Sequence, residues 1–320
     1  MNDYPFLREV RSPLSEEDLR PLDPRCNVVQ FRSPLTDDDF QKLSRFLAQY
    51  PTVPLRIYGH YADGIEDLRF LRYFPTLRGF YSDVFETKSW DGLEFLPDNL
   101  EFLGLGATRK SLSLAALARF KEVRDLGLEG HKKDLEAIIP LVNIEFLSLK
   151  SISLPNLSLL EPLRKLRGLA LRLGGTKELK FPDLPDLRYL ELWMIRGLTD
   201  ISGISDLDNL RYLFLQDLKN VTALPSLRAM PKLERLHLEN LKGLTDLSPV
   251  SEAIGLRDLL LISMNHLKLD NLRCLLNHPS LRAATIGLGS LRRNKDASEL
   301  LGLDSVSGDF KPIEKYTAKN

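Results

Sequence analysis

Leucine and other aliphatic residues recur along this chain in the pattern Leu-x-x-Leu-x-Leu at a near-fixed interval. Successive copies of the pattern begin 21 to 25 residues apart. Apolar residues two positions apart predict a short strand with one buried face, and a period in this range is typical of a solenoid of stacked coils. The copies begin at Leu77, Leu100, Val123, Ile144, Leu166, Leu187, Leu210, Leu233, Leu256 and, in weakened form, Leu281.

The coil that starts at Leu187 shows how each repeat is expected to fold. Leu190 and Leu192 should point into the core, whereas Tyr189, Glu191 and Trp193 should point to the opposite, open face. The strand is followed by apolar residues at every third position, which favours a turn and a short 3₁₀ segment. These residues are Ile195, Leu198, Ile201 and Ile204. We therefore predict a parallel sheet whose strands pair from coil to coil.

The segments that return the chain to the next strand differ in their helical tendency. Residues 111–120 and 133–139 have alanine and leucine at helical spacing and are predicted to be helical. The segments around Pro182, Pro185 and Pro225 are too rich in proline to form more than a turn.

The two ends of the chain depart from the repeat. Thr36 is predicted to cap a helix that opens with three aspartates and buries Phe40, Leu43, Phe46 and Leu47. Short strands are expected at residues 28–31 and 53–57. We divide the chain into degenerate N-terminal capping repeats over residues 1–76, the repeat array over 77–290, and a C-terminal cap with a loose tail over 291–320.

The repeats resemble the leucine-rich-repeat superfamily over residues 77–290. The segments 197–204 and 243–250, which read Gly-Leu-Thr-Asp-Ile-Ser-Gly-Ile and Gly-Leu-Thr-Asp-Leu-Ser-Pro-Val, resemble bacterial internalin-type repeats. The resemblance implies an α/β solenoid, a leucine-rich-repeat horseshoe with a parallel β-sheet on the concave face and short helices or 3₁₀ turns on the convex face. It also implies a bacterial source, and it leaves the partner open because function is grafted onto such folds.

The ninth repeat position departs from the family pattern, which usually has asparagine there. The residues at this position are Phe85, Thr108, His131, Ile152, Gly174, Ile195, Leu218, Leu241 and Met264. The four aliphatic residues at the end of this series resemble the cysteine-type repeats of ubiquitin-ligase substrate receptors. No adaptor-binding segment precedes them, so that role is not carried over. We expect this aliphatic row to be buried between turns.

Charge and cysteine content favour a cytoplasmic protein without nucleic-acid or membrane partners. The 44 lysines and arginines balance 44 aspartates and glutamates, so no global positive field attracts phosphate. The first residues lack an apolar run of signal-peptide length, and no stretch is long enough to span a membrane. Cys26 and Cys274 lie at opposite ends of the repeats, which is typical of a reducing compartment. We expect a monomer in the absence of a partner.

The search for catalytic or cofactor motifs leads us to expect no enzyme activity, no cofactor and no metal. Residues 103–111 contain Gly104 and Gly106 before Lys110, but Arg109 stands where a phosphate-binding loop needs glycine. The five histidines, His60, His131, His237, His266 and His278, do not have the spacing of metal ligands. No Gly-x-Ser-x-Gly nucleophile motif is present.

The open face of the predicted sheet provides the most specific functional signal. Equivalent positions of successive coils stack in rows, and aromatic residues and arginine are enriched at binding hot spots. We predict a protein-binding site at Tyr189, Trp193, Tyr212, Phe214, Arg235 and His237. Small residues beside it predict a hollow, at Gly104, Gly106, Gly127, Ser148, Gly168 and Ala170. In the alternative interpretation the tyrosines only cover one another, and Arg235 stacks on Tyr212 and pairs with Asp258.

A second row of residues offers a different function. Arginine follows the first leucine of several repeats, at Arg78, Arg167, Arg188, Arg211, Arg257 and Arg282. Glu101, Glu145 and Glu234 interrupt this row, which favours a solvated rim over a nucleic-acid groove. The leading hypothesis is a non-enzymatic scaffold that binds a protein on its concave face, as a bacterial immunity, antitoxin or effector protein. The alternative is recognition of nucleic acid or an anionic ligand by the arginine row.

Overall fold

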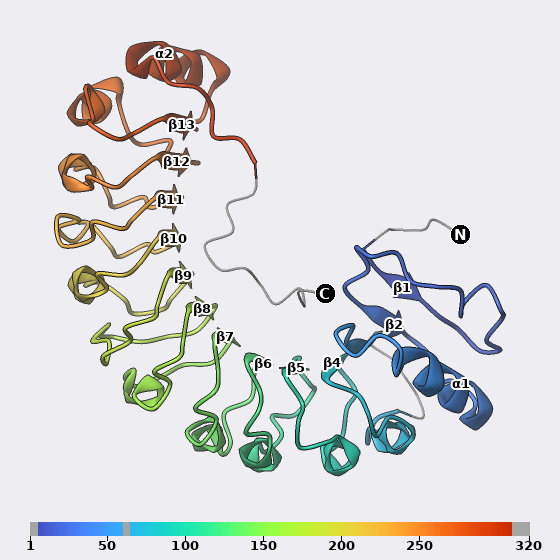
Figure 1. Cartoon of the computed structure of the whole chain (residues 1–320). Helices are drawn as coiled ribbons and strands as arrows, with labels where there is room; N and C mark the ends of the chain where they lie inside the picture. Colours follow the sequence, from blue (N-terminus) through green and yellow to red (C-terminus); the bar gives the residue numbers. More distant parts are fainter. Residues whose placement is uncertain (1–5, 60–64, 309–320) are drawn as a thin grey trace. The chain divides into compact units, whose positions relative to one another are not determined.

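The computed structural model describes residues 6–59 and 65–308 of the chain. They divide into two compact units, one over residues 6–144 and one over residues 145–308. In each unit the strands follow chain order and pair in parallel (Figure 1). The boundaries predicted at residues 76 and 290 remain predictions, and the predicted loose tail from residue 311 lies outside the described residues.

The described residues of the first unit form one α-helix, six strands and four 3₁₀ segments. Its strands are β1 (Arg8–Glu9), β2 (Val29–Phe31), β3 (Leu55–Gly59), β4 (Gly79–Val84), β5 (Phe102–Leu105) and β6 (Asp125–Glu129). The helix is α1 (Asp37–Leu47), and the 3₁₀ segments are η1 (Arg69–Tyr73), η2 (Asp91–Phe95), η3 (Ala115–Arg119) and η4 (Leu135–Ile138).

The second unit repeats a strand and a turn with greater regularity. Its strands are β7 (Phe146–Lys150), β8 (Gly168–Arg172), β9 (Tyr189–Trp193), β10 (Tyr212–Gln216), β11 (Arg235–Glu239), β12 (Asp258–Ile262) and β13 (Ala283–Ile286). The 3₁₀ segments are η5 (Ser158–Leu160), η6 (Ser202–Asp206), η7 (Ser248–Glu252) and η8 (Leu269–Leu275), and α2 (Leu291–Leu301) follows the last strand. The strands line one side of this unit and the 3₁₀ segments the other (Figure 1).

The leucine pattern places the strands as the sequence predicts. Each strand of β9, β10 and β11 begins two residues after the first leucine of its repeat. Leu190, Leu213 and Leu236 stand in register on these strands and have no exposed surface. The predicted parallel solenoid is confirmed, and its core is a stack of equivalent apolar side chains.

The return segments over residues 111–120 and 133–139 contain 3₁₀ structure, which corrects the helices predicted there. Only the 3₁₀ segments η3 and η4 form there, because apolar residues at every third position match the three residues per 3₁₀ turn. No helix forms between β8 and β9 or between β10 and β11, where the prolines lie. In both internalin-like segments an aspartate side chain accepts a hydrogen bond from the first backbone N–H of the following 3₁₀ segment. Asp200 Oδ1 accepts the Ser202 N–H, and Asp246 Oδ1 accepts the Ser248 N–H, each at 2.8 Å.

The predicted N-terminal helix is confirmed in detail. Thr36 caps α1, and its side-chain oxygen accepts the Asp39 N–H at 3.2 Å. All four predicted apolar residues of this helix are buried. At the other end, α2 was not predicted as a helix. Ser290 caps it, and Gly302 closes it at a positive φ of 62°, which glycine adopts without steric cost.

In the second unit the ninth repeat position is buried and follows a residue in left-handed conformation. Ile195, Leu218, Leu241 and Met264 are all buried, as predicted. The preceding residues have φ near +50°, and they are Ser151, Leu173, Met194, Asp217, Asn240 and Ser263. His131 takes the same place in the first unit. Its Nδ1 accepts the Leu112 N–H at 3.2 Å, and its Nε2 donates to the Gly106 carbonyl at 2.9 Å, so it binds backbone groups there.

Replacement of Leu218 by asparagine is expected to destabilise the fold. Leu218 has no exposed surface, and a buried amide without partners costs about 1–3 kcal/mol in addition to the lost apolar contacts. Chemical unfolding should show a lower midpoint, whereas the adjacent exposed change Lys219→Asn should have little effect. An unchanged or raised melting temperature for Leu218→Asn would mean that this turn accommodates the asparagine ladder of related repeats.

Candidate functional site

The six residues predicted as a binding site lie together on three adjacent strands of the second unit. Tyr212 on β10 stands in register with Tyr189 on β9 and with Arg235 on β11. The same pairing places Phe214 beside His237 and Gln216 beside Trp193. We call the open-face residues Tyr189, Trp193, Tyr212, Phe214 and His237 the aromatic patch. Each of them is half-buried.

The rings of the aromatic patch pack against one another as pairs. Tyr189 and Tyr212 meet edge to face, with ring centroids 5.2 Å apart. Phe214 and His237 meet in the same way at 4.4 Å. Edge-to-face contacts of this kind stabilise the rings beyond simple burial. The patch is therefore a pre-ordered apolar surface, and it continues onto the half-buried Leu260 of β12.

Arg235 has a different role from the rings beside it. Its side chain is only 9% exposed, and its Nε and Nη2 donate to Asp258 Oδ2 at 3.0 and 2.7 Å. This ion pair between Arg235 and Asp258 is the one that the alternative interpretation of the open face predicts. Glu191 is held similarly, since Arg172 contacts both of its carboxylate oxygens at 2.6 Å and the Tyr189 hydroxyl donates to it at 2.7 Å. These paired charges fix the neighbouring rings in place.

Two further carboxylates lie at the end of the strands, Asp217 directly after β10 and Glu239 as the last residue of β11. The Trp193 indole Nε1–H donates to Asp217 Oδ2 at 3.2 Å. The Asn240 amide also donates to the Asp217 carboxylate. On the neighbouring strand, the Gln216 amide donates to Glu239 Oε1 at 3.1 Å. Asp217 has a φ of 54°, a conformation that aspartate and asparagine tolerate better than most residues.

His237 is neutral at physiological pH. Burial, together with the nearby Arg235 guanidinium, lowers the pKa of His237 to about 4, because both disfavour the imidazolium. Its Nε2 lies 3.3 Å from Glu239 Oε2. At neutral pH this contact therefore joins a carboxylate to an uncharged ring.

The lowered pKa of His237 predicts a loss of stability in acid. In the unfolded chain the imidazole has a pKa of about 6.5, so between about pH 6.5 and 4 the unfolded state binds more protons than the folded state. The free energy of unfolding should therefore fall as pH falls through this window. Buried His131, whose pKa burial also lowers, adds a loss of the same sign.

A single variant tests whether His237 causes this loss of stability in acid. Urea unfolding at a series of pH values should show a shallower acid loss in His237→Gln than in the parent protein. The variant His278→Gln, made elsewhere in the second unit, serves as the comparison. An identical slope in parent and His237→Gln would contradict the lowered pKa.

The predicted hollow beside the aromatic patch is largely filled, which corrects that expectation. In the first unit, a Cβ on Gly104 would lie 2.2 Å from the Tyr81 ring, so that ring covers this glycine. In the second unit, Gly168 and Ala170 are buried. Phe146 and Tyr189, on the strands to either side of Gly168, have ring centroids only 6.2 Å apart. Their strands are about 9.6 Å apart, so the rings lean toward each other over the glycine.

The arginine row is partly neutralised by the glutamates that interrupt it. Arg78 pairs with Glu101 in the first unit. In the second unit Arg167 pairs with Glu145 at 3.4 Å and Arg211 with Glu234 at 2.6 Å. The remaining members of the row are Arg188, Arg257 and Arg282. The pairs interrupt the continuous positive stripe that a phosphate backbone would need.

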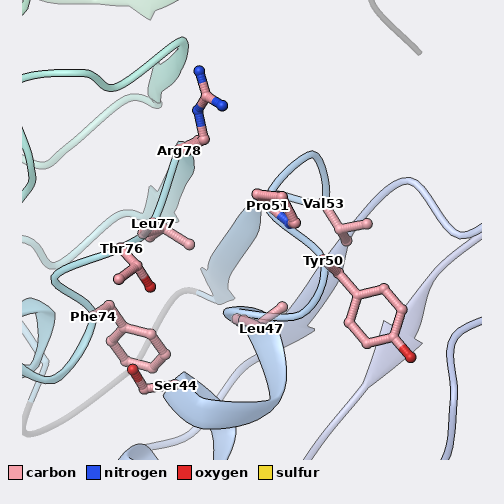
Figure 2. Close-up of a pocket in the computed structure, with 9 residues that line it drawn as sticks. All are labelled: Ser44, Leu47, Tyr50, Pro51, Val53, Phe74, Thr76, Leu77 and Arg78. Atoms are coloured by element: carbon pink, nitrogen blue, oxygen red, sulfur yellow. The ribbon is translucent and has the colours of Figure 1, made fainter. Parts of the chain in front are cut away.

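Two hollows of the first unit differ in the residues that line them. A niche between the end of α1 and β4 is lined by nine residues, among which are Ser44, Tyr50, Phe74 and Arg78 (Figure 2). None of the nine is a carboxylate, histidine or cysteine. A wider cleft beside Trp90 has Arg119 at its wall, but that guanidinium is engaged by Asp98 and by backbone carbonyls. The residues lining this cleft also include no histidine or cysteine.

Residues of the glycine-rich segment have structural partners. Gly104 admits the Tyr81 ring, and Arg109, which stands in place of a loop glycine, pairs with Glu86. Across residues 6–59 and 65–308, no three His, Cys, Asp or Glu residues are grouped as a metal site would require. His60 lies outside the described residues.

Comparisons with known proteins agree with this fold. No protein-family model and no curated protein matches the chain. Among solved structures, an internalin from Listeria monocytogenes is similar, with a TM-score of 0.59 and 15% identity over 82% of this chain and 75% of that one. A leucine-rich-repeat protein from Leptospira interrogans has a TM-score of 0.45 and 17% identity, covering 89% and 90%. The leucine-rich-repeat domain of the type III effector XopL has a TM-score of 0.42 and 22% identity, covering 54% and 64%.

The internalin likeness, with a TM-score of 0.59, identifies the fold. Together with the repeated Leu-x-x-Leu-x-Leu pattern and the parallel coils, the internalin likeness shows that this chain has the fold of the leucine-rich-repeat superfamily. At 15% identity the likeness concerns the fold alone. In the part of the chain that the structure describes, no helix is long and apolar enough to cross a membrane.

The predicted site omitted Asp217 and Glu239. Glu239 occupies the seventh repeat position, but its relation to Asp217 depends on the left-handed residue that follows each strand. The residue after each strand from β6 to β12, at the eighth repeat position, has a positive φ. This conformation brings it beside the seventh residue of the next repeat, as Asp217 lies beside Glu239. The sequence gives a weak signal of this conformation in Asp217 and Asn240, because both residue types favour it.

Proposed function

We propose that this chain binds a protein partner through the aromatic patch on the open face of β9, β10 and β11. The observation that supports it best is the clustering of Tyr189, Trp193, Tyr212 and Phe214 on adjacent strands, each half-buried. A contiguous apolar surface on the outside of a folded unit is characteristic of an interaction site, and aromatic residues dominate binding energy at such sites.

The proposed function is that of a non-enzymatic scaffold acting as a monomer in the cytoplasm. Its hydrogen-bonded and charge-paired open-face residues present a pre-ordered surface, which reduces the entropy cost of binding. More specifically, we propose that the chain is a bacterial immunity, antitoxin or effector protein. The internalin-like segments support this proposal. Nucleic-acid binding by the arginine row is disfavoured, because Glu101, Glu145 and Glu234 each pair with a member of that row.

Site-specific cross-linking tests the position of the interface. A photoreactive phenylalanine analogue at Gln216, beside Trp193 on the patch, should capture a protein from a lysate of the source organism. The same analogue at Asp206, an exposed residue of the 3₁₀ segment η6, is the matched control and should not capture that protein. Capture from Asp206 but not from Gln216 would move the interface to the turn side.

Salt dependence separates protein binding from the nucleic-acid alternative. Neutralising several phosphates makes affinity fall steeply and linearly with the logarithm of salt concentration. The captured partner should show a shallow dependence, because apolar contacts dominate the patch. A steep dependence that disappears after Arg188→Gln and Arg257→Gln, with no effect of changes at Trp193, would favour the arginine row.

A further inference from the structure

The carboxylates on the open face around the aromatic patch differ in how their charges are balanced. Glu191 is paired with Arg172, and Asp258 is paired with Arg235. Each of these ion pairs joins neighbouring strands. In both pairs an arginine of one strand compensates a carboxylate of the next strand.

Asp217 and Glu239, at the end of the strands beside the aromatic patch, have no such arginine partner among the described residues. Asp217 accepts hydrogen bonds from the Trp193 indole and the Asn240 amide, which are both uncharged donors. Glu239 accepts one from the Gln216 amide, and its other contact is the neutral His237 ring. Neither carboxylate has a lysine or arginine nitrogen within 4.0 Å among the described residues.

The two carboxylates also influence each other. Burial and the Asp217 charge raise the pKa of Glu239, as expected for like charges close together. The Glu239 side chain is only 27% exposed, so water screens this repulsion incompletely. A cation placed beside both groups would relieve the repulsion and find two acceptors.

Trp193 completes an environment suited to an organic cation. Its indole, held by Asp217, is half-buried and belongs to the aromatic patch. The face of tryptophan attracts guanidinium and ammonium groups more strongly than other rings do, and a planar guanidinium can contact a carboxylate through two N–H groups. A hydrated inorganic ion would use the carboxylates but would gain little from the indole.

We propose that Asp217, Glu239 and Trp193 bind an arginine or lysine side chain of the protein partner. This proposal rests on the proposed function of the aromatic patch and names the chemistry of the partner there. The partner segment carries a basic side chain next to an apolar one, because Glu239 stands in register with Ile262 of β12, and His237, on the same face of β11, stands in register with Phe214 and Leu260.

The indole N–H of Trp193 provides a direct measurement on the full chain. The chain has two tryptophans, so the Trp193 indole resonance is assigned by its loss in Trp193→Phe, while the buried Trp90 is an internal reference. The probe is the peptide acetyl-Gly-Arg-Gly-amide, with the lysine peptide and its neutral citrulline counterpart at matched ionic strength. The arginine or lysine peptide should shift the Trp193 resonance saturably and leave that of Trp90 unchanged.

The double variant Asp217→Asn, Glu239→Gln isolates the role of charge. Asparagine tolerates the positive φ of residue 217 and retains an oxygen for the indole, so the fold should persist. Affinity for the charged peptide should fall at least tenfold. The control Asp206→Asn, Asp208→Asn removes two charges from exposed residues of the same unit and should leave the titration unchanged.

Three results would overturn this proposal. They are equal shifts with the citrulline and arginine peptides, a titration unaltered by the Asp217 and Glu239 changes, and the absence of any shift with both basic peptides. The proposed function has a separate test. If the cross-linked partner loses affinity after Trp193 and Tyr212 are changed but binds the Asp217→Asn, Glu239→Gln protein as before, the patch is the interface and the cation site is wrong.

Discussion

A protein with both Trp193→Ala and Tyr212→Ala should fold normally and bind its partner at least about thirtyfold more weakly, a loss of ~2 kcal/mol. Both side chains project from the open face, and the leucines that alternate with them make the core. Truncation removes the edge contact between Tyr189 and Tyr212, and cross-strand pairs of this kind contribute about 0.2–1 kcal/mol. Calorimetric titration with the captured partner and a thermal melt of each protein provide the two measurements.

Phe95→Ala is the matched control for this experiment. Phe95 is an exposed aromatic residue, 39% accessible, on a 3₁₀ segment of the first unit. Its removal should change neither melting nor affinity. If the Trp193 and Tyr212 variant unfolds, the rings are part of the structural core. If it folds and binds as the parent protein does, the interface lies elsewhere, and the turn side and residues 1–76 are the next surfaces to test.

Replacement of Leu213 by alanine should destabilise the second unit by about 2–5 kcal/mol. Leu213 has no exposed surface and stands in register between Leu190 and Leu236. The truncated side chain leaves a cavity between coils that cannot close without shifting the strands on both sides. Urea unfolding monitored by circular dichroism should show a lower midpoint with an unchanged slope.

Gln216→Ala, on the open face of the same strand, is the control for Leu213→Ala. Gln216 points to the open face and is half-buried, so its truncation should cost about 0.5 kcal/mol or less. A loss below ~0.5 kcal/mol for Leu213→Ala would contradict the register in which every second strand residue is buried.

The sequence by itself determined the solenoid and the face of each strand residue. The repeat length and the alternation around Leu190 and Leu192 specify a buried and an open face, because side chains on a strand alternate strictly. The same spacing placed Tyr189, Tyr212 and Arg235 in one row, since equivalent residues of parallel coils stack. The sequence also predicted that Leu218, at the ninth repeat position, is buried and that Thr36 caps α1. Whether the aromatic patch binds a protein remains a prediction.

Only the tertiary structure decided how neighbouring side chains on that face interact. Glycines at 104 and 168 predict a hollow, yet Tyr81 and the pair of Phe146 and Tyr189 fill the space. Arg235 pairs with Asp258, whereas Glu239 meets only uncharged groups. Repeat spacing fixes the position and face of a residue, but the direction of a long side chain depends on its rotamer, on the neighbouring coils and on the left-handed turn after each strand. The direction of each long side chain therefore depends on contacts between residues some 20 positions apart in the sequence. No local sequence pattern encodes such contacts.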